Sequence, residues 1–137
     1  MWCYINVVVE TYAGDNTITF SEKTFRALQT PAPWMLFACK DSIDYLRSIG
    51  FDVLDGLVNH SYDSVYQTGT NGIDKINNWI ATGIQNLESI KRYSVDYVRN
   101  RCLTASEHNQ NLLKQWRTQW PNDFAKWLDN ALRVLNS

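Results

Sequence analysis

Cys3-Tyr-Ile-Asn-Val-Val-Val-Glu-Thr11 is the stretch that decides the fold, because it is rich in β-branched and aromatic residues. The valine run at its centre predicts a strand buried on both faces, which is typical of a parallel sheet. Glu10 then ends the apolar run with a charge. The residues that follow must therefore provide partner strands and covering helices.

Two further apolar runs, at residues 34–38 and 51–54, are predicted strands. Helix-like segments lie between the strands, and they open near Ser21 and near Asp41 or Ser42, whose side chains suit an N-cap. Strands and helices thus alternate with short links, an order that favours right-handed crossovers. The sequence predicts an α/β fold with a small, Rossmann-like, three-stranded parallel sheet.

The period of the apolar pattern changes after a loop-like stretch at residues 55–71. Apolar residues then recur every three or four positions, which marks an amphipathic helix. They are Ile73, Ile76, Ile80, Ile84, Leu87 and Ile90. Three shorter helices are expected beyond residue 93, and the last opens at Pro121, because proline suits a first helical turn.

Length and composition fit one domain over residues 1–137, with a sheet-containing part at 1–66 and a helical part at 72–137. The net charge of −1 gives no general attraction for DNA or an anionic membrane. No apolar stretch approaches the ~20 residues that span a bilayer. The cysteines show no zinc or redox spacing, and free thiols suit a cytoplasmic protein.

The charge is divided unevenly, since residues 1–70 carry −4 and residues 71–137 carry +3. Solvated helix faces account for this division. A basic strip with interleaved tyrosines is the only feature that suggests a nucleic-acid groove, and its charge is small, so a nucleic-acid partner is not expected. The strip comprises Lys91, Arg92, Tyr93, Tyr97, Arg99 and Arg101.

Candidate metal ligands are sparse. His60 lies in a polar loop and His108 on a predicted helix, and neither has ligand-type neighbours at metal-binding spacing. Asp41 and Asp44, at i and i+3, could form a carboxylate pair, but helix capping accounts for the first and solvent exposure for the second. The sequence therefore predicts no metal site.

A candidate ligand site lies where Glu10 ends the first strand and Ser21-Glu22-Lys23 opens the next helix. Open α/β sheets bind ligands at the carboxyl ends of their strands, beside helix N-termini whose free N–H groups attract phosphate. A lysine there adds a charge for a diphosphate, and a carboxylate accepts bonds from ribose hydroxyls. A nucleoside diphosphate fits Glu10, Ser21, Glu22 and Lys23. Alternatively, Glu22 is an ordinary first-turn residue, Lys23 is solvated, and Glu10 caps backbone or pairs with Lys23 or Arg26.

The same residues resemble a known pattern. In α-1,3-fucosyltransferases a strand ends in Phe-Glu-Asn, and after a short link Thr/Ser-Glu-Lys opens a helix. The chain resembles more closely the glycosyltransferase-like proteins of tailed phages and marine bacteria. These add an apolar strand, a Tyr-Leu-Arg-x-(Leu/Ile)-Gly-Phe segment, a Ser-Tyr-Asp and a later His-Asn. The matching segments here are Val9 to Thr11, Ser21 to Thr24, Trp34 to Ala38, Tyr45 to Phe51, Ser61 to Asp63 and His108-Asn109.

This resemblance implies the donor-binding lobe of a two-lobed, GT-B glycosyltransferase. By it, Glu22 binds the donor ribose, Lys23 binds the diphosphate, and Glu10 supports or contacts the donor sugar. A nucleotide sugar is then the substrate, and no cofactor is implied. Thr11 stands where the family has asparagine. No acceptor lobe fits before Met1 and no catalytic residue is identified, so we expect a partner lobe in trans, or an oligomer, to complete an enzyme.

The alternative function is a non-catalytic module derived from such a lobe, which serves in a phage particle or binds a host protein. A narrow sheet leaves edges that need cover, and tryptophans on helical stripes can form an interface patch. A protein partner or a homo-oligomer is therefore expected in either case. The missing acceptor lobe favours the interaction module, whereas Glu10, Glu22 and Lys23 together favour nucleotide-sugar binding.

Overall fold

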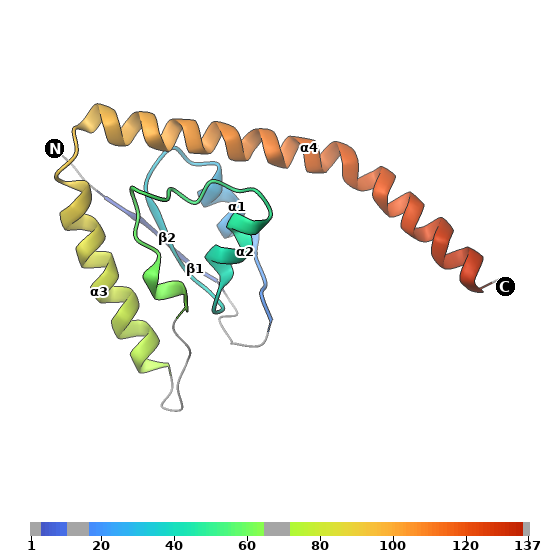
Figure 1. Ribbon diagram of the computed structural model, residues 1–137, viewed down its shortest axis with the longest axis horizontal. Coiled ribbons are helices and arrows are strands. Elements are labelled where there is room, and N and C mark those ends of the chain that lie inside the picture. Colours follow the sequence, from blue (N-terminus) through green and yellow to red (C-terminus); the bar gives the residue numbers. More distant parts are fainter. Residues whose placement is uncertain (1–3, 11–16, 65–71, 136–137) are drawn as a thin grey trace.

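The computed structural model describes residues 4–10, 17–64 and 72–135, with side chains at all of them except 124, 125 and 127–135. The molecule is a mixed α/β protein that is mostly helical, with a small parallel sheet (Figure 1). The predicted fold class is confirmed at this level. Residues 65–71, the later part of the predicted loop, lie outside the described residues.

The sheet in the described part of the chain consists of β1 (Asn6–Val9) and β2 (Trp34–Phe37), which run parallel. Val8 is opposite Leu36 and is buried in the core, whereas the valines on either side of Val8 are more than half exposed on the other face. The first two predicted strands are thus confirmed, but the expectation that the valine run is buried on both faces is wrong, because only the face that carries Val8 is buried. The largest fully buried apolar side chains include Leu28, Trp34, Met35, Ile43, Leu46 and Ile90.

Two short helices follow the strands, α1 (Glu22–Leu28) after β1 and α2 (Ser42–Ser48) after β2. The Ser21 hydroxyl caps α1 by accepting the backbone N–H of Lys23 at 3.3 Å. At the end of α2, Gly50 has a φ of 98°, and the N–H groups of Gly50 and Phe51 return to the carbonyls of Arg47 and Leu46. This is a Schellman ending, which a residue without a side chain accommodates best.

The third strand predicted at residues 51–54 is not formed. The side-chain amide of Asn109 takes the place of a neighbouring strand: it accepts the Asp52 N–H at 2.8 Å and donates to the Asp52 carbonyl at 2.9 Å. Leu54 has a φ of 65°, a left-handed conformation that an extended strand excludes. Residues 51–54 are therefore held by side chains rather than by a sheet ladder.

A second buried asparagine holds the next part of this segment. Asn86 lies on α3 (Ile73–Ile90) and is 2% exposed. Its amide accepts the Asn59 N–H at 2.7 Å and donates to the Asn59 carbonyl at 3.0 Å. The chain then forms a short 3-10 helix, η1 (Ser61–Ser64). Both α3 and the last helix thus make side-chain hydrogen bonds to the irregular segment that follows α2.

Helix α3 turns its more polar face inward. Its buried residues are Lys75, Thr82, Asn86 and Ile90, and the indole N–H of Trp79 donates to the Leu36 carbonyl of β2 at 3.2 Å. An apolar stripe usually faces the core. Here the isoleucine stripe is largely exposed, at Ile73, Ile76, Ile80 and Ile84.

The chain ends in one long helix, α4 (Val95–Leu135), and not in the three shorter helices that were expected. Residues 95–120 contain no glycine or proline, so nothing in that stretch stops the helix. The helix also continues through Pro121. Its 41 residues correspond to roughly 60 Å, and the second half projects away from the body (Figure 1).

We predict that Asn109→Ala lowers the free energy of unfolding by about 3 kcal/mol, because it leaves the N–H and carbonyl of Asp52 and the carbonyl of Leu28 without the amide partner that each has now. Urea unfolding followed by circular dichroism measures this loss. Asn111→Ala, on the exposed side of the same helix, is the control and should change stability by less than about 0.5 kcal/mol. Equal effects at the two positions would contradict this account of residues 51–54.

Candidate functional site

The carboxyl end of β1 brings together three of the four residues that the sequence assigns to a ligand site. The Glu10 carboxylate, 6% exposed, accepts the backbone N–H of Ser21 at 2.9 Å and the hydroxyl of Thr24. Lys23 returns to the same strand end, with its ammonium 3.5 Å from the Val9 carbonyl. Glu22 is exposed on the first turn of α1. The end of β1 and the opening of α1 therefore form one corner.

Glu10 acts in this corner as a tethered anion. Burial by itself would raise the pKa of Glu10, but the hydrogen bonds from Ser21 and Thr24, with the charge of Lys23, hold it below its usual value. The Ser21 N–H is bonded to Glu10, and the Lys23 N–H is bonded to the Ser21 hydroxyl. The expectation of free N–H groups at this helix start is therefore wrong for these two, because the chain supplies their acceptors itself.

Lys75 is a residue that the sequence reasoning missed. It lies in the first turn of α3, is 4% exposed, and donates from Nζ to the carbonyl of Ala38, just after β2, at 2.5 Å. Its ammonium is 5.5 Å from the centre of the Phe37 ring. Lysine is rarely buried to this extent. The available signal was the spacing of Lys75, Trp79, Thr82 and Asn86, which puts the lysine on the inward face of the helix.

Asp41, Asp44 and Asp63 have carboxylate oxygens within 4.8 Å of one another. Oxygen donors of this kind suit Mg²⁺ or Ca²⁺. The Asp63 carboxylate, however, already accepts the N–H groups of Ile43 and Asp44 at 2.9 and 3.3 Å. It caps α2 from η1, whereas Asp41, expected as a cap, makes no side-chain cap bond. The primary role of Asp63 is therefore to fix the start of α2.

The Ser-Tyr-Asp segment also ties β2 to the irregular chain. The Tyr62 hydroxyl accepts the Leu36 N–H at 3.1 Å and lies 2.9 Å from Nδ1 of His60. Nε2 of His60 is 2.6 Å from the Val53 carbonyl, which can only accept, so that nitrogen carries the hydrogen and Nδ1 accepts from Tyr62. Burial lowers the pKa of His60 against the opposing effect of its hydrogen bond to the Val53 carbonyl. These contacts make the segment a structural element of the site's framework.

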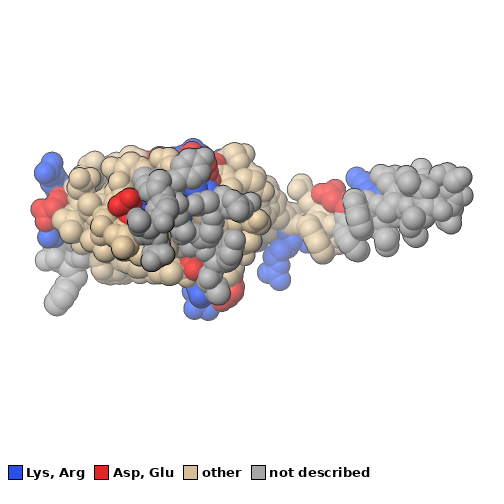
Figure 2. All heavy atoms as spheres, turned by 90° about the horizontal axis from the view of Figure 1, so that it is seen from below, with Lys and Arg blue, Asp and Glu red and all other residues tan. Residues whose placement is uncertain are grey.

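The basic strip, which runs from the end of α3 through the link into α4, is partly neutralised by ion pairs. Arg101 binds the Asp52 carboxylate through two bonds of 2.7 and 2.8 Å, and Lys91 lies 3.6 Å from Glu88. On the described surface seen in Figure 2, most basic side chains lie near acidic ones, and a basic group where α4 leaves the body stands apart. This distribution does not favour a nucleic-acid groove on that face.

Comparison of the chain with protein-family models, with curated proteins and with solved structures finds no match. Among the described residues, the helices include none with both the length and the apolar character needed to cross a bilayer. The fold and the corner at the end of β1 must therefore be interpreted from the chain's own residues.

The cap at α2 generates a pH prediction. Burial, reinforced by Asp44 and Asp41, raises the pKa of Asp63 from 3.8 to about 6 against the effect of its backbone hydrogen bonds. The folded state then binds more protons than the unfolded state between these values, so this group's contribution to stability falls as the pH rises from 4 to 6. Asp63→Asn, which cannot ionise, should gain up to about 3 kcal/mol over the wild type across that range.

Urea unfolding of both proteins from pH 3 to pH 7 measures this difference. Asp55→Asn is a control of opposite sign, because the hydrogen bonds from Arg47 lower the pKa of Asp55. The advantage of Asp55 is present above its ordinary pKa and is lost as the pH falls below it. A stability difference for Asp63→Asn that stays constant over this range would show that Asp63 does not titrate as described.

Proposed function

We propose that this chain is a glycosyltransferase-like domain that binds a nucleotide sugar and works with a partner lobe or a second subunit that holds the acceptor. The carrying observation is the meeting of Glu10, Ser21 and Lys23 at the carboxyl end of a parallel strand pair. This end of an open α/β sheet is where such folds bind their ligands. The resemblance of residues 4–66 to donor lobes supports the same assignment.

The contacts suggest how the four residues divide the work. Glu10 is buried and bonded to the start of α1, so its role in this proposal is to position the helix opening rather than to contact a sugar. Glu22 and Lys23 are exposed on the first turn, where the carboxylate can accept ribose hydroxyls and the ammonium can bind a diphosphate. Transfer to an acceptor also needs an oriented hydroxyl and a base, which the proposal leaves to the partner.

In this assignment residues 51–54 correspond to the third strand of a Rossmann-like lobe, with the Asn109 amide replacing the strand pairing. The segments that carry the resemblance also hold neighbouring parts of the fold in place. Asp63 fixes α2, Tyr62 fixes β2, and Asn109 fixes the chain after α2. Segments far apart in sequence thus support one framework behind the corner at Glu10.

A second candidate function is the non-catalytic interaction module, of a phage particle or against a host protein. The hydrogen bonds of Ser21 and Lys23 favour it, because two N–H groups expected to bind phosphate are already used. The outward isoleucine stripe of α3 favours it as well. Both functions are compatible with the same fold, so a ligand titration must decide between them.

We predict that nucleoside diphosphates, or their sugar derivatives, raise the free energy of unfolding of the chain by about 2.7 kcal/mol at a ligand concentration of 100 times Kd, and so raise its melting temperature. Titration with the diphosphates of each common base, followed by differential scanning fluorimetry, measures the shift. Lys23→Ala should abolish most of it, because the diphosphate loses its cation. Arg26→Ala, exposed on the last turn of the same helix, is the matched control and should retain it. No shift with any nucleotide would leave the interaction module as the better assignment.

A further inference from the structure

Helix α3 has an apolar face that the rest of its own domain leaves exposed. Ile73, Ile76, Ile80 and Ile84 are 54, 43, 48 and 59% exposed. They repeat at the spacing of one helix face. Each buried isoleucine stabilises a protein by a few kcal/mol relative to leaving it in water, so a four-residue stripe is costly to expose. A continuous stripe of this kind marks an interface.

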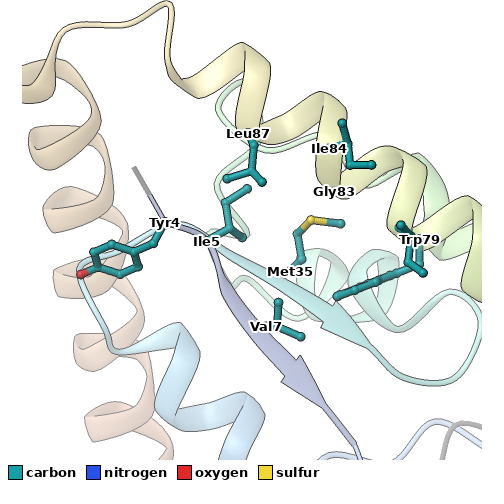
Figure 3. Close-up of a pocket in the computed structure, with 9 residues that line it drawn as sticks. Tyr4, Ile5, Val7, Met35, Trp79, Gly83, Ile84 and Leu87 are labelled. Atoms are coloured by element: carbon teal, nitrogen blue, oxygen red, sulfur yellow. The ribbon is translucent and has the colours of Figure 1, made fainter. Parts of the chain in front are cut away.

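The stripe continues into a groove beside the sheet. A cavity of about 420 Å³ lies between α3 and β1, and Tyr4, Val7, Met35, Ile80 and Ile84 are among its lining residues (Figure 3). Tyr4, Val7 and Val9 are 62, 59 and 51% exposed. With the isoleucines they form an apolar surface on the order of several hundred Å². A standard dimer buries roughly 800 Å² per partner, so this surface is of a suitable size.

Among the described residues, no strand pairs with the outer edge of β1. Asn6 and Glu10 donate their N–H groups towards β2, to the carbonyls of Pro33 and Phe37. In a parallel ladder alternate residues bond to the same neighbour, so the N–H groups of Val7 and Val9 point to the other side. In the described part of the chain β1 has β2 as its strand neighbour and none beyond. An open edge beside an apolar groove calls for an extended strand with alternating apolar side chains.

The charges favour a second copy of the same chain as the occupant. Residues 4–9 carry no charge, and between Asp74 and Glu88 the exposed face of α3 carries none either, because Lys75 is buried. Two copies can therefore meet over the middle of this surface without bringing like charges together, because Asp74 and Glu88 lie near its ends. The strand sequence is also β-branched and free of proline and glycine, which is the composition that pairs with itself.

We propose that β1 pairs antiparallel with β1 of a second copy of this chain about a two-fold axis. The two sheets then join in the strand order β2–β1–β1–β2, and the α3 helices of both copies lie on the same face. The isoleucine stripes meet above the paired valines and close the groove. An isologous contact of this kind needs a self-complementary patch, which an uncharged edge strand provides. This inference does not rest on nucleotide binding.

Sedimentation equilibrium over a range of concentrations tests the proposal. The wild type should have twice the chain mass of 15.9 kDa at micromolar concentration. Val7→Lys and Ile84→Glu, both at exposed positions, should weaken association at least ~30-fold, since each places a charge in an apolar interface. Val95→Lys, at a similarly exposed apolar position at the start of α4, is the matched control and should remain a dimer.

Amide hydrogen exchange followed by NMR tests the strand pairing itself. The N–H groups of Val7 and Val9 should exchange slowly in the wild type and quickly in the monomeric Ile84→Glu variant. Three results would overturn the proposal: a wild type that stays monomeric to millimolar concentration, fast exchange at Val7 and Val9 in a dimer, or a dimer lost in Trp120→Ala but kept in Val7→Lys. The last result would place the contact on the projecting half of α4.

Discussion

The fold depends on how the buried backbone between α2 and α3 is satisfied without a strand beside it. A peptide N–H or carbonyl that is buried without a partner lowers the free energy of unfolding by an amount comparable to a lost hydrogen bond. The amides of Asn109 and Asn86 carry the same donor and acceptor as a peptide group, and each brackets one residue of this segment, Asp52 and Asn59. The buried segment therefore depends on both helices being held in fixed positions.

The corner at the end of β1 is fixed by a related device, but with a charge. Glu10 occupies the position beside α1 where a bound anion would be favoured, and its bonds to Ser21 and Thr24 join strand to helix. These bonds hold the strand end and the helix start in fixed relative positions. The corner can bind a ligand only if the ligand contacts groups that Glu10 leaves at the surface. Lys23 and Glu22 are those groups in the proposed site, and their value depends on the position that Glu10 gives them.

Local chemistry predicted much of this structure, and distant contacts explain what it did not. The valine run and the Trp34 run form strands, and Ser21 caps α1, because each depends on neighbouring residues. Residues 51–54 have a strand's composition, but their partner Asn109 is 57 positions away in the chain from Asp52, and a lone asparagine gives no sign of that role. Likewise, Asp63 caps α2 from 20 positions beyond Ile43, where local rules favoured Asp41 or Ser42.

The orientation of α3 also follows from the need to give buried backbone groups hydrogen-bond partners. Its inward face supplies Lys75, Trp79 and Asn86 to backbone carbonyls at β2 and at Asn59, bonds that an isoleucine could not make. Satisfying the backbone thus forces the apolar stripe outward, beside a strand whose outer edge is unpaired among the described strands. The inward face of α3 thus serves hydrogen bonds within the chain, and its outward apolar face is left to be buried against a partner. Since β1 carries Glu10 at one end and the open valines along its length, a partner seated there would also brace the corner proposed to bind the nucleotide.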